Sequence, residues 1–174
     1  AQSLGIDSAR AATHVVAQWA MQRQLEELVS SEVGLYLDLP VGVNTDAYEV
    51  WRHRHLFVTE LAAGAPPDPL FLGGQNWGLP PLAPAAMRRD RYQYFIRCLR
   101  HHMRVAGMLR IDHVMGLFRL YAVPQGRPAT DGVYVRYPHE ELLAILTLES
   151  HRMRCAIVGE DLGTVPPEVR PAMA

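Results

Sequence analysis

Two acidic residues each follow a short apolar run. The segment LRIDHVMG, residues 109–116, delivers Asp112, and VGEDLG, residues 158–163, delivers Glu160. Two carboxylates brought to one place can act as nucleophile and as general acid/base, and cleavage of a glycosidic bond with retention needs such a pair about 5 Å apart. Asp112 and Glu160 are therefore the candidate catalytic residues. The alternative is that both are structural acids at strand ends.

Arg110 and His113 flank Asp112 closely. Leu109 and Ile111 alternate with Arg110 and Asp112, so a strand with its period of two places the guanidinium and the carboxylate on one face. There Arg110 is expected to stabilise the ionised form of Asp112, or to form an ion pair that is only structural. His113 could donate to or accept from a substrate hydroxyl, or it could be a buried histidine with no such role.

A third feature is the Gly- and Pro-rich segment GQNWGLPP, residues 74–81, which contains Trp77. Exposing an indole in a surface loop is costly, and its flat face can carry a sugar ring. We therefore expect Trp77 to bind substrate, although the segment could also be an ordinary cluster of turns.

The surrounding pattern predicts the elements that position these residues. Strands alternate with helices, which indicates an α/β fold with a parallel sheet in one continuous piece. A long loop, residues 40–84, is expected to interrupt the pattern, with a short helix at 47–61. The remaining elements are expected to be helices at 11–31, 85–106 and 139–152, strands at 34–39, 109–112 and 155–158, and two strands at 118–123 and 133–137 that flank a turn.

Composition narrows the functional classes. The chain has 174 residues, 49% hydrophobic and 20% charged, which is typical of a globular domain, and no signal peptide or membrane span is visible, so a cytoplasmic location is expected. The net charge of -1 gives no case for nucleic acid as a partner. All 17 basic residues are Arg, which excludes a Schiff-base lysine and a Walker-type phosphate loop.

Neither the cysteines nor the histidines form a metal motif. Cys98 and Cys155 lack CxxC spacing and are expected to be buried free thiols in a reducing compartment. The His53/His55 and His101/His102 pairs match no metal-ligand spacing, so no metal is expected.

Seven segments in order along the chain carry a resemblance to a known family. Together they resemble bacterial 4-alpha-glucanotransferases (amylomaltases, glycoside hydrolase family 77). The resemblance implies a TIM barrel with inserted subdomains, and transfer of α-1,4-glucan segments between malto-oligosaccharides without a metal or organic cofactor. The segments are GLYLDLPVGV (34–43), GAPPDPL (64–70), GQNWGLPPL (74–82), LRIDHVMGLFRLY (109–121), VYVRYP (133–138), LTLES (146–150) and IVGEDLGTVP (157–166).

The same resemblance implies roles by position. Asp112 takes the place of the family's nucleophile and Glu160 that of its general acid/base. The implied substrate-binding residues are Arg110, His113, Asp38, Asp68, Gln75 and Trp77.

One departure from the family affects the expected extent of the fold. The family has a third carboxylate, an Asp preceded by His on a later barrel strand, that we do not find here, and a full barrel needs roughly 200 residues or more. We therefore expect residues 1–174 to be a central fragment of one catalytic domain, a partial barrel covering roughly the third to fifth strands, and to be inactive alone. The alternative functions are a related retaining α-glucan hydrolase or branching enzyme, or a fragment that binds glucan without catalysis.

Overall fold

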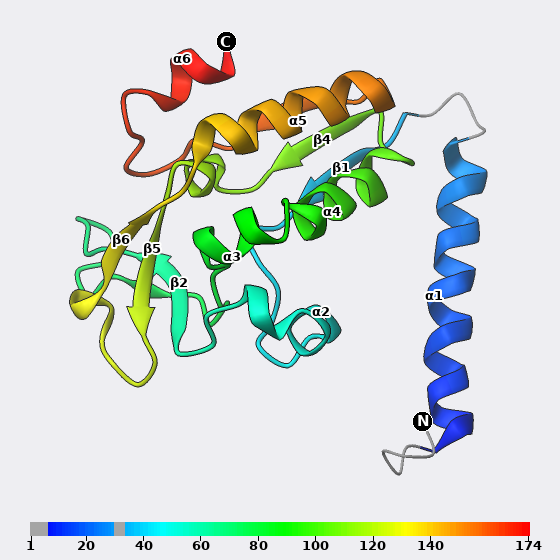
Figure 1. The fold of residues 1–174 in the computed structure, drawn as a ribbon, viewed down its shortest axis with the longest axis horizontal. Coiled ribbons are helices and arrows are strands. Elements are labelled where there is room, and N and C mark those ends of the chain that lie inside the picture. Colours follow the sequence, from blue (N-terminus) through cyan, green and yellow to red (C-terminus); the bar gives the residue numbers. More distant parts are fainter. Residues whose placement is uncertain (1–6, 30–33) are drawn as a thin grey trace.

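The structure, a computed structural model, describes residues 7–29 and 34–174 and contains a parallel and an antiparallel sheet (Figure 1). The parallel sheet has the order β1-β4-β7, with β1 Tyr36–Leu39, β4 Met108–Ile111 and β7 Ala156–Gly159. The antiparallel sheet has the order β3-β2-β5-β6, with β2 Leu61–Ala65, β3 Gln75–Asn76, β5 Arg119–Pro124 and β6 Val133–Arg136. The predicted α/β class with a parallel sheet is confirmed, and the second sheet was not expected.

Most helices pack around these sheets, but the first stands apart from them (Figure 1). Helix α1 confirms the predicted N-terminal helix as far as Val29, and the last two positions of that prediction lie outside the described residues. None of its residues is buried, so its apolar side chains do not contribute to the core. The helices are α1 Ser8–Val29, α2 Tyr48–Arg52, α3 Pro84–Arg89, α4 Gln93–Met103, α5 His139–Met153 and α6 Val169–Met173, with 3₁₀ turns η2 Arg54–Leu56, η3 Val114–Leu117 and η4 Ala129–Asp131.

Side chains of the parallel strands point alternately to a buried face and to a more exposed face of the sheet. Leu109 and Ile111 of β4 are buried in the main core cluster, with Leu37 and Ile157 of the neighbouring strands packed against it. The intervening residues face the other side and are more exposed, among them Asp38 of β1. The period of two predicted for the Asp112 segment is therefore confirmed.

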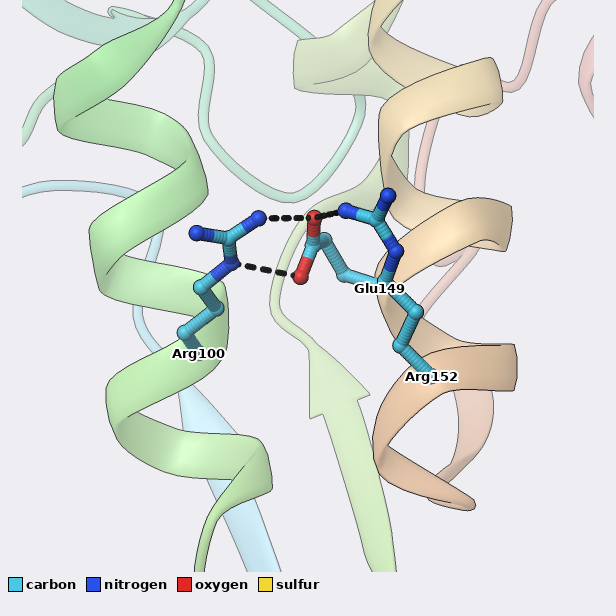
Figure 2. A network of polar contacts seen from close by, with 3 residues as sticks. All are labelled: Arg100, Glu149 and Arg152. Carbon is cyan, nitrogen blue, oxygen red and sulfur yellow. Dashed lines mark hydrogen bonds and ion pairs between the residues drawn. The ribbon is translucent and has the colours of Figure 1, made fainter.

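Helices α4 and α5 lie side by side over β4 and are joined by a buried carboxylate (Figure 2). Glu149 of α5, 2% exposed, accepts bonds from Nε and Nη2 of Arg100 on α4 at 2.7 and 2.8 Å. Nη1 of Arg152 adds a third bond at 3.0 Å. A buried carboxylate is tolerated only with such partners. The cluster thus fixes α5, which leads into β7, against α4.

The expected long loop at 40–84 was largely wrong, because it contains β2 and β3. The sequence of β2, LAAGA, lacks the β-branched and aromatic residues that usually mark a strand. Its small residues are needed where β3 approaches: a Cβ on Gly64 would lie 2.0 Å from the carbonyl oxygen of Gln75. The helix predicted at 47–61 ends at Arg52.

The single helix predicted at 85–106 was also wrong, since it is divided into α3 and α4. Arg91 and Tyr92 adopt left-handed backbone conformations, with φ of 53° and 57°, which interrupts the helix. The two strands predicted around a turn at 118–137 are confirmed as the β5–β6 hairpin.

Candidate active site

The register of the parallel sheet brings the two candidate catalytic residues to one edge. Ile111 pairs with Gly159, so Asp112 and Glu160 both follow directly after the carboxyl ends of adjacent strands. The ladder extends one step further, because the backbone N–H of Glu160 donates to the carbonyl of Ile111 at 3.0 Å. The prediction that Asp112 and Glu160 meet at one edge of a parallel sheet agrees with this arrangement.

The backbone of His113, the residue that follows Asp112, contacts the Glu160 carboxylate. Its φ of 51° is in the left-handed region, which is uncommon for a residue other than glycine and is typical of functional sites. In this conformation its N–H donates to Oε2 of Glu160 at 2.8 Å, while the N–H of Leu162 donates to Oε1 at 2.9 Å. Both oxygens of Glu160 are therefore oriented by backbone donors.

Arg110 bridges Asp112 and Asp38. Its Nη2 lies 3.0 Å from Oδ1 of Asp112, and its Nη1 donates to Oδ2 of Asp38 at 2.6 Å. The bond to Asp38 raises the pKa of the Arg110 guanidinium, so the cation beside Asp112 persists at every working pH. Arg110 and Asp112 therefore form the pair that their spacing predicted.

A cavity of about 630 Å³ opens beside the carboxylates and is large enough for a drug-sized ligand. Neither Arg110 nor Asp38 lines it, so the structure connects these two to the cavity only through Asp112. The other six predicted site residues line it: Asp68, Gln75, Trp77, Asp112, His113 and Glu160.

Trp77 is positioned by three contacts and is half-buried, not exposed in a loop as the sequence suggested. Its Nε1 donates to Oε1 of Gln75 at 3.1 Å, its backbone N–H donates to the carbonyl of Ala63, and its ring meets the imidazole of His113 edge to face with centroids 5.2 Å apart. Burial lowers the pKa of His113, against the opposing effect of Glu160 and Asp112. The imidazole is therefore neutral at neutral pH.

Asp68 shapes a loop that lines the cavity. Its Oδ1 accepts the backbone N–H groups of Leu70 and Phe71 at 2.8 and 2.6 Å, which closes a tight turn. Because one carboxylate oxygen is already used, only Oδ2 is left for a ligand.

Three residues of the hairpin line the same cavity and were not identified from the sequence: Arg119 and Tyr121 of β5, and Tyr134 of β6. The sequence carried a usable signal, since Arg119 and Tyr121 lie two apart on a predicted strand and so share a face. What it did not show was that this face turns toward Asp112.

A second cavity, about 510 Å³ and mainly apolar, borders Asp112 and His113 from the side of α4. Glu160 does not line it, so it cannot bring both carboxylates to one ligand. In residues 7–29 and 34–174 no three His, Cys, Asp or Glu side chains gather as a metal site would require. Nor does any helix of that described part have the length and apolar character to cross a membrane.

Comparison with known proteins decides the family. Residues 5–174 match the family described as 4-alpha-glucanotransferase, glycoside hydrolase family 77. The chain belongs to this family. The family resemblance inferred from the seven sequence segments is thus confirmed.

Individual 4-alpha-glucanotransferases agree with this assignment. The chain is 47% identical over 159 residues to the enzyme of Haemophilus influenzae and 40% identical over 163 residues to that of Mycobacterium tuberculosis, covering 88% and 90% of this chain. It spans 23% and 22% of the length of those two proteins, about a quarter.

Two solved amylomaltases share the fold. The structure from Corynebacterium glutamicum matches with a TM-score of 0.85 at 34% identity, covering 90% of this chain and 23% of the other. The Streptococcus agalactiae amylomaltase in complex with acarbose matches with a TM-score of 0.82 at 24% identity, covering 92% and 34%. The mixed α/β fold is therefore that of the matching part of these 4-alpha-glucanotransferase relatives.

Proposed function

We propose that the protein transfers segments of α-1,4-glucan between malto-oligosaccharides with retention at the anomeric carbon. The observation that carries the proposal is the link between Asp112 and Glu160. They follow adjacent parallel strands, line one cavity, and are joined through the backbone N–H of His113, in a chain of the 4-alpha-glucanotransferase family.

In the first half-reaction Glu160 acts as general acid and Asp112 as nucleophile. Glu160 gives its proton to the glycosidic oxygen as the bond from that oxygen to C1 breaks, and a carboxylate oxygen of Asp112 bonds to C1. Arg110, 3.0 Å from Asp112, favours the ionised form that this attack needs. The product is a glycosyl ester on Asp112 with inverted configuration.

In the second half-reaction Glu160 acts as general base. The 4-hydroxyl of an acceptor glucan loses its proton to Glu160 and attacks C1, and the ester bond to Asp112 breaks. The second inversion restores the α configuration, and both residues return to their starting protonation states.

The cavity walls offer groups that suit a glucan. The Trp77 indole can cover the face of a sugar ring, while Gln75, His113 and the free oxygen of Asp68 can bond its hydroxyls. Transfer in preference to hydrolysis requires these walls to retain the acceptor and to exclude water. We assign Asp38 an indirect part, holding Arg110 in place by the 2.6 Å bond.

We further propose that the parallel sheet is part of a β/α barrel and that its three strands are the third to fifth of that barrel. Parallel sheets are normally covered on both faces, yet here Tyr36, Met108 and Val158 are 57%, 39% and 38% exposed on the face opposite α4 and α5. Such a face, which also carries Arg110 and Asp112, suits the interior of a barrel. The free thiols Cys98 and Cys155 favour a cytoplasmic location.

Incubation of the full-length gene product with maltotriose tests the proposed function. We expect release of glucose together with maltopentaose and longer oligomers. Glucose and maltose without longer products would assign the protein to the hydrolases instead. Saturable binding of maltotriose with no turnover would support the alternative of a glucan-binding protein.

A further inference from the structure

Arg119, at the start of β5, has no acceptor in the described part of the chain. Within residues 7–29 and 34–174 its side chain forms no hydrogen bond and no ion pair, and its Nε is buried without a partner. A guanidinium has five N–H donors, and leaving buried donors unpaired costs free energy. The guanidinium can therefore donate hydrogen bonds to an acceptor that is not among these residues.

A tyrosine holds this guanidinium in place. Cζ of Arg119 lies 4.1 Å from the centroid of the Tyr134 ring, a cation–π contact across the hairpin. Tyr134 in turn meets Tyr121 edge to face at 5.1 Å, and the hydroxyl of Tyr121 donates to the carbonyl of Ala129 at 2.8 Å. The stack fixes one face of the guanidinium of a side chain that lines the cavity.

The carboxylates of the cavity already have other partners. Asp112 pairs with Arg110, both oxygens of Glu160 accept backbone N–H groups, and Asp68 accepts two more. Arg119 lines the same cavity but pairs with none of them. Its role is therefore not to neutralise the catalytic acids.

The surrounding charge also argues for a ligand. Arg136 lies directly across the strand pair from Arg119, and like charges in that position destabilise a hairpin. No acid is paired with either of them in the part of the chain that the structure describes.

We propose that Arg119, stacked on Tyr134, binds the hydroxyls of a glucosyl unit away from the bond that is cleaved, and so sets the preference for longer malto-oligosaccharides. This rests on the proposed function. The guanidinium has several N–H donors in one plane, and two of them can donate to neighbouring sugar hydroxyl oxygens. We place this glucosyl unit away from the reacting carbon because Arg119 pairs with neither catalytic carboxylate among the described residues, whereas Arg110 lies beside Asp112.

The test measures the transfer kinetics of the full-length gene product with maltotriose and with maltoheptaose as substrates. For Arg119→Leu we expect KM for maltoheptaose to rise about tenfold, because one charge-assisted hydrogen bond is lost. KM for maltotriose should rise less. For both substrates KM should change more than kcat. Arg119→Lys keeps the charge without the planar donors and should lie in between. Tyr134→Ala should resemble Arg119→Leu, and Tyr134→Phe should not.

Arg127 offers a matched control, since it lies in the turn of the same hairpin and pairs with Asp131 at 2.8 Å outside the cavity. Arg127→Leu should leave both KM values unchanged. Equal KM values for wild type and Arg119→Leu would overturn the inference, as would a lowered melting temperature with unchanged chain-length preference, which would show that Arg119 binds another part of the protein.

The two proposals fail separately. If the wild-type protein transfers glucan and Arg119→Leu keeps its chain-length preference, only the inference about Arg119 is wrong. If the wild-type protein shows no transfer, the proposed function is wrong, and calorimetric binding of maltoheptaose to wild type and Arg119→Leu then decides the inference. A tenfold weaker affinity of the variant supports it, and equal affinity or no binding by either protein overturns it.

Discussion

The backbone N–H of His113 donates a hydrogen bond of 2.8 Å to Oε2 of Glu160, so the residue that follows one candidate catalytic carboxylate orients the other. The left-handed conformation of His113 makes this bond possible at the point where β4 ends. The relative position of the two acids is therefore set by main-chain geometry, which is more rigid than a contact between two long side chains.

Replacing Asp112 with Asn should lower the transfer rate by at least about a thousandfold, because a neutral amide cannot form the glycosyl ester. Steady-state release of glucose from maltotriose measures this. Asp38→Asn is the matched control: Asp38 bonds Arg110 and does not line the cavity, so we expect less than about a tenfold loss. Near-normal activity of Asp112→Asn would show that Asp112 is not the nucleophile.

Replacing Glu160 with Gln should slow both half-reactions with natural glucans. Substrates whose leaving group needs no proton, such as a glucosyl fluoride, should still glycosylate Asp112 at close to the normal rate. The ratio of the two rates, compared with that of the wild type, is the measurement. An equal loss with both kinds of substrate would show that Glu160 is not the general acid.

Trp77→Ala should weaken the use of oligosaccharides and also lower stability. The indole is half-buried, bonds Gln75 and contacts His113, so truncation removes a sugar platform and disturbs its neighbours. We expect a several-fold rise in KM and a loss of about 2 kcal/mol in the free energy of unfolding. Trp51→Ala, at an indole 66% exposed and away from the cavity, should change neither. A stability loss with unaltered KM would restrict Trp77 to a structural role.

The Glu149 cluster predicts an order of stabilities (Figure 2). Arg100 makes two bonds to the buried carboxylate and Arg152 makes one, so Arg100→Met should destabilise the protein more than Arg152→Met. Both arginines are about half exposed, which keeps both losses below that of a fully buried pair. Urea unfolding measures the difference, and the reverse order would contradict the assigned geometry.

His113 predicts a pH dependence of stability. Burial lowers its pKa in the folded state below the usual 6.5, so the unfolded chain binds the proton more readily. Stability is then lost as the pH falls from about 6.5 toward the lowered folded value. His113→Asn, a residue that accepts the left-handed backbone, should lose less stability than the wild type between pH 7.5 and 5.5 in urea unfolding. Identical stability losses for the wild type and His113→Asn would show that folding does not lower the pKa of His113.

The parallel strands could be predicted from the sequence because each is a short apolar run, and in the Asp112 segment the run also has a period of two. The same rule paired Arg110 with Asp112 and brought Asp112 and Glu160 to one edge. These features depend on residues close together in sequence and on the general geometry of parallel sheets.

The hairpin was predicted, but the pairing of β2 and β3 with it and its position beside the cavity could not be predicted in this way. The strand LAAGA is defined by the close approach of β3 to Gly64, a contact between distant segments that leaves no local pattern. The break between α3 and α4 depends on Arg91 and Tyr92 adopting a conformation that their residue types do not favour. Arg119 could be assigned to the site only from the structure, which shows that it lines the same cavity as Asp112.

The central claim, a covalent intermediate on Asp112, can be tested directly by trapping it. Glu160→Gln incubated with an activated glucosyl fluoride, without acceptor, should accumulate the glycosyl-enzyme, because the first half-reaction proceeds and the second lacks its base. After proteolysis, mass spectrometry should find one added glucosyl unit on the peptide that contains Asp112, and none when Asp112 is also replaced by Asn. A glucosyl unit on a different carboxylate, or release of a product with inverted configuration and no trapped enzyme, would contradict the account.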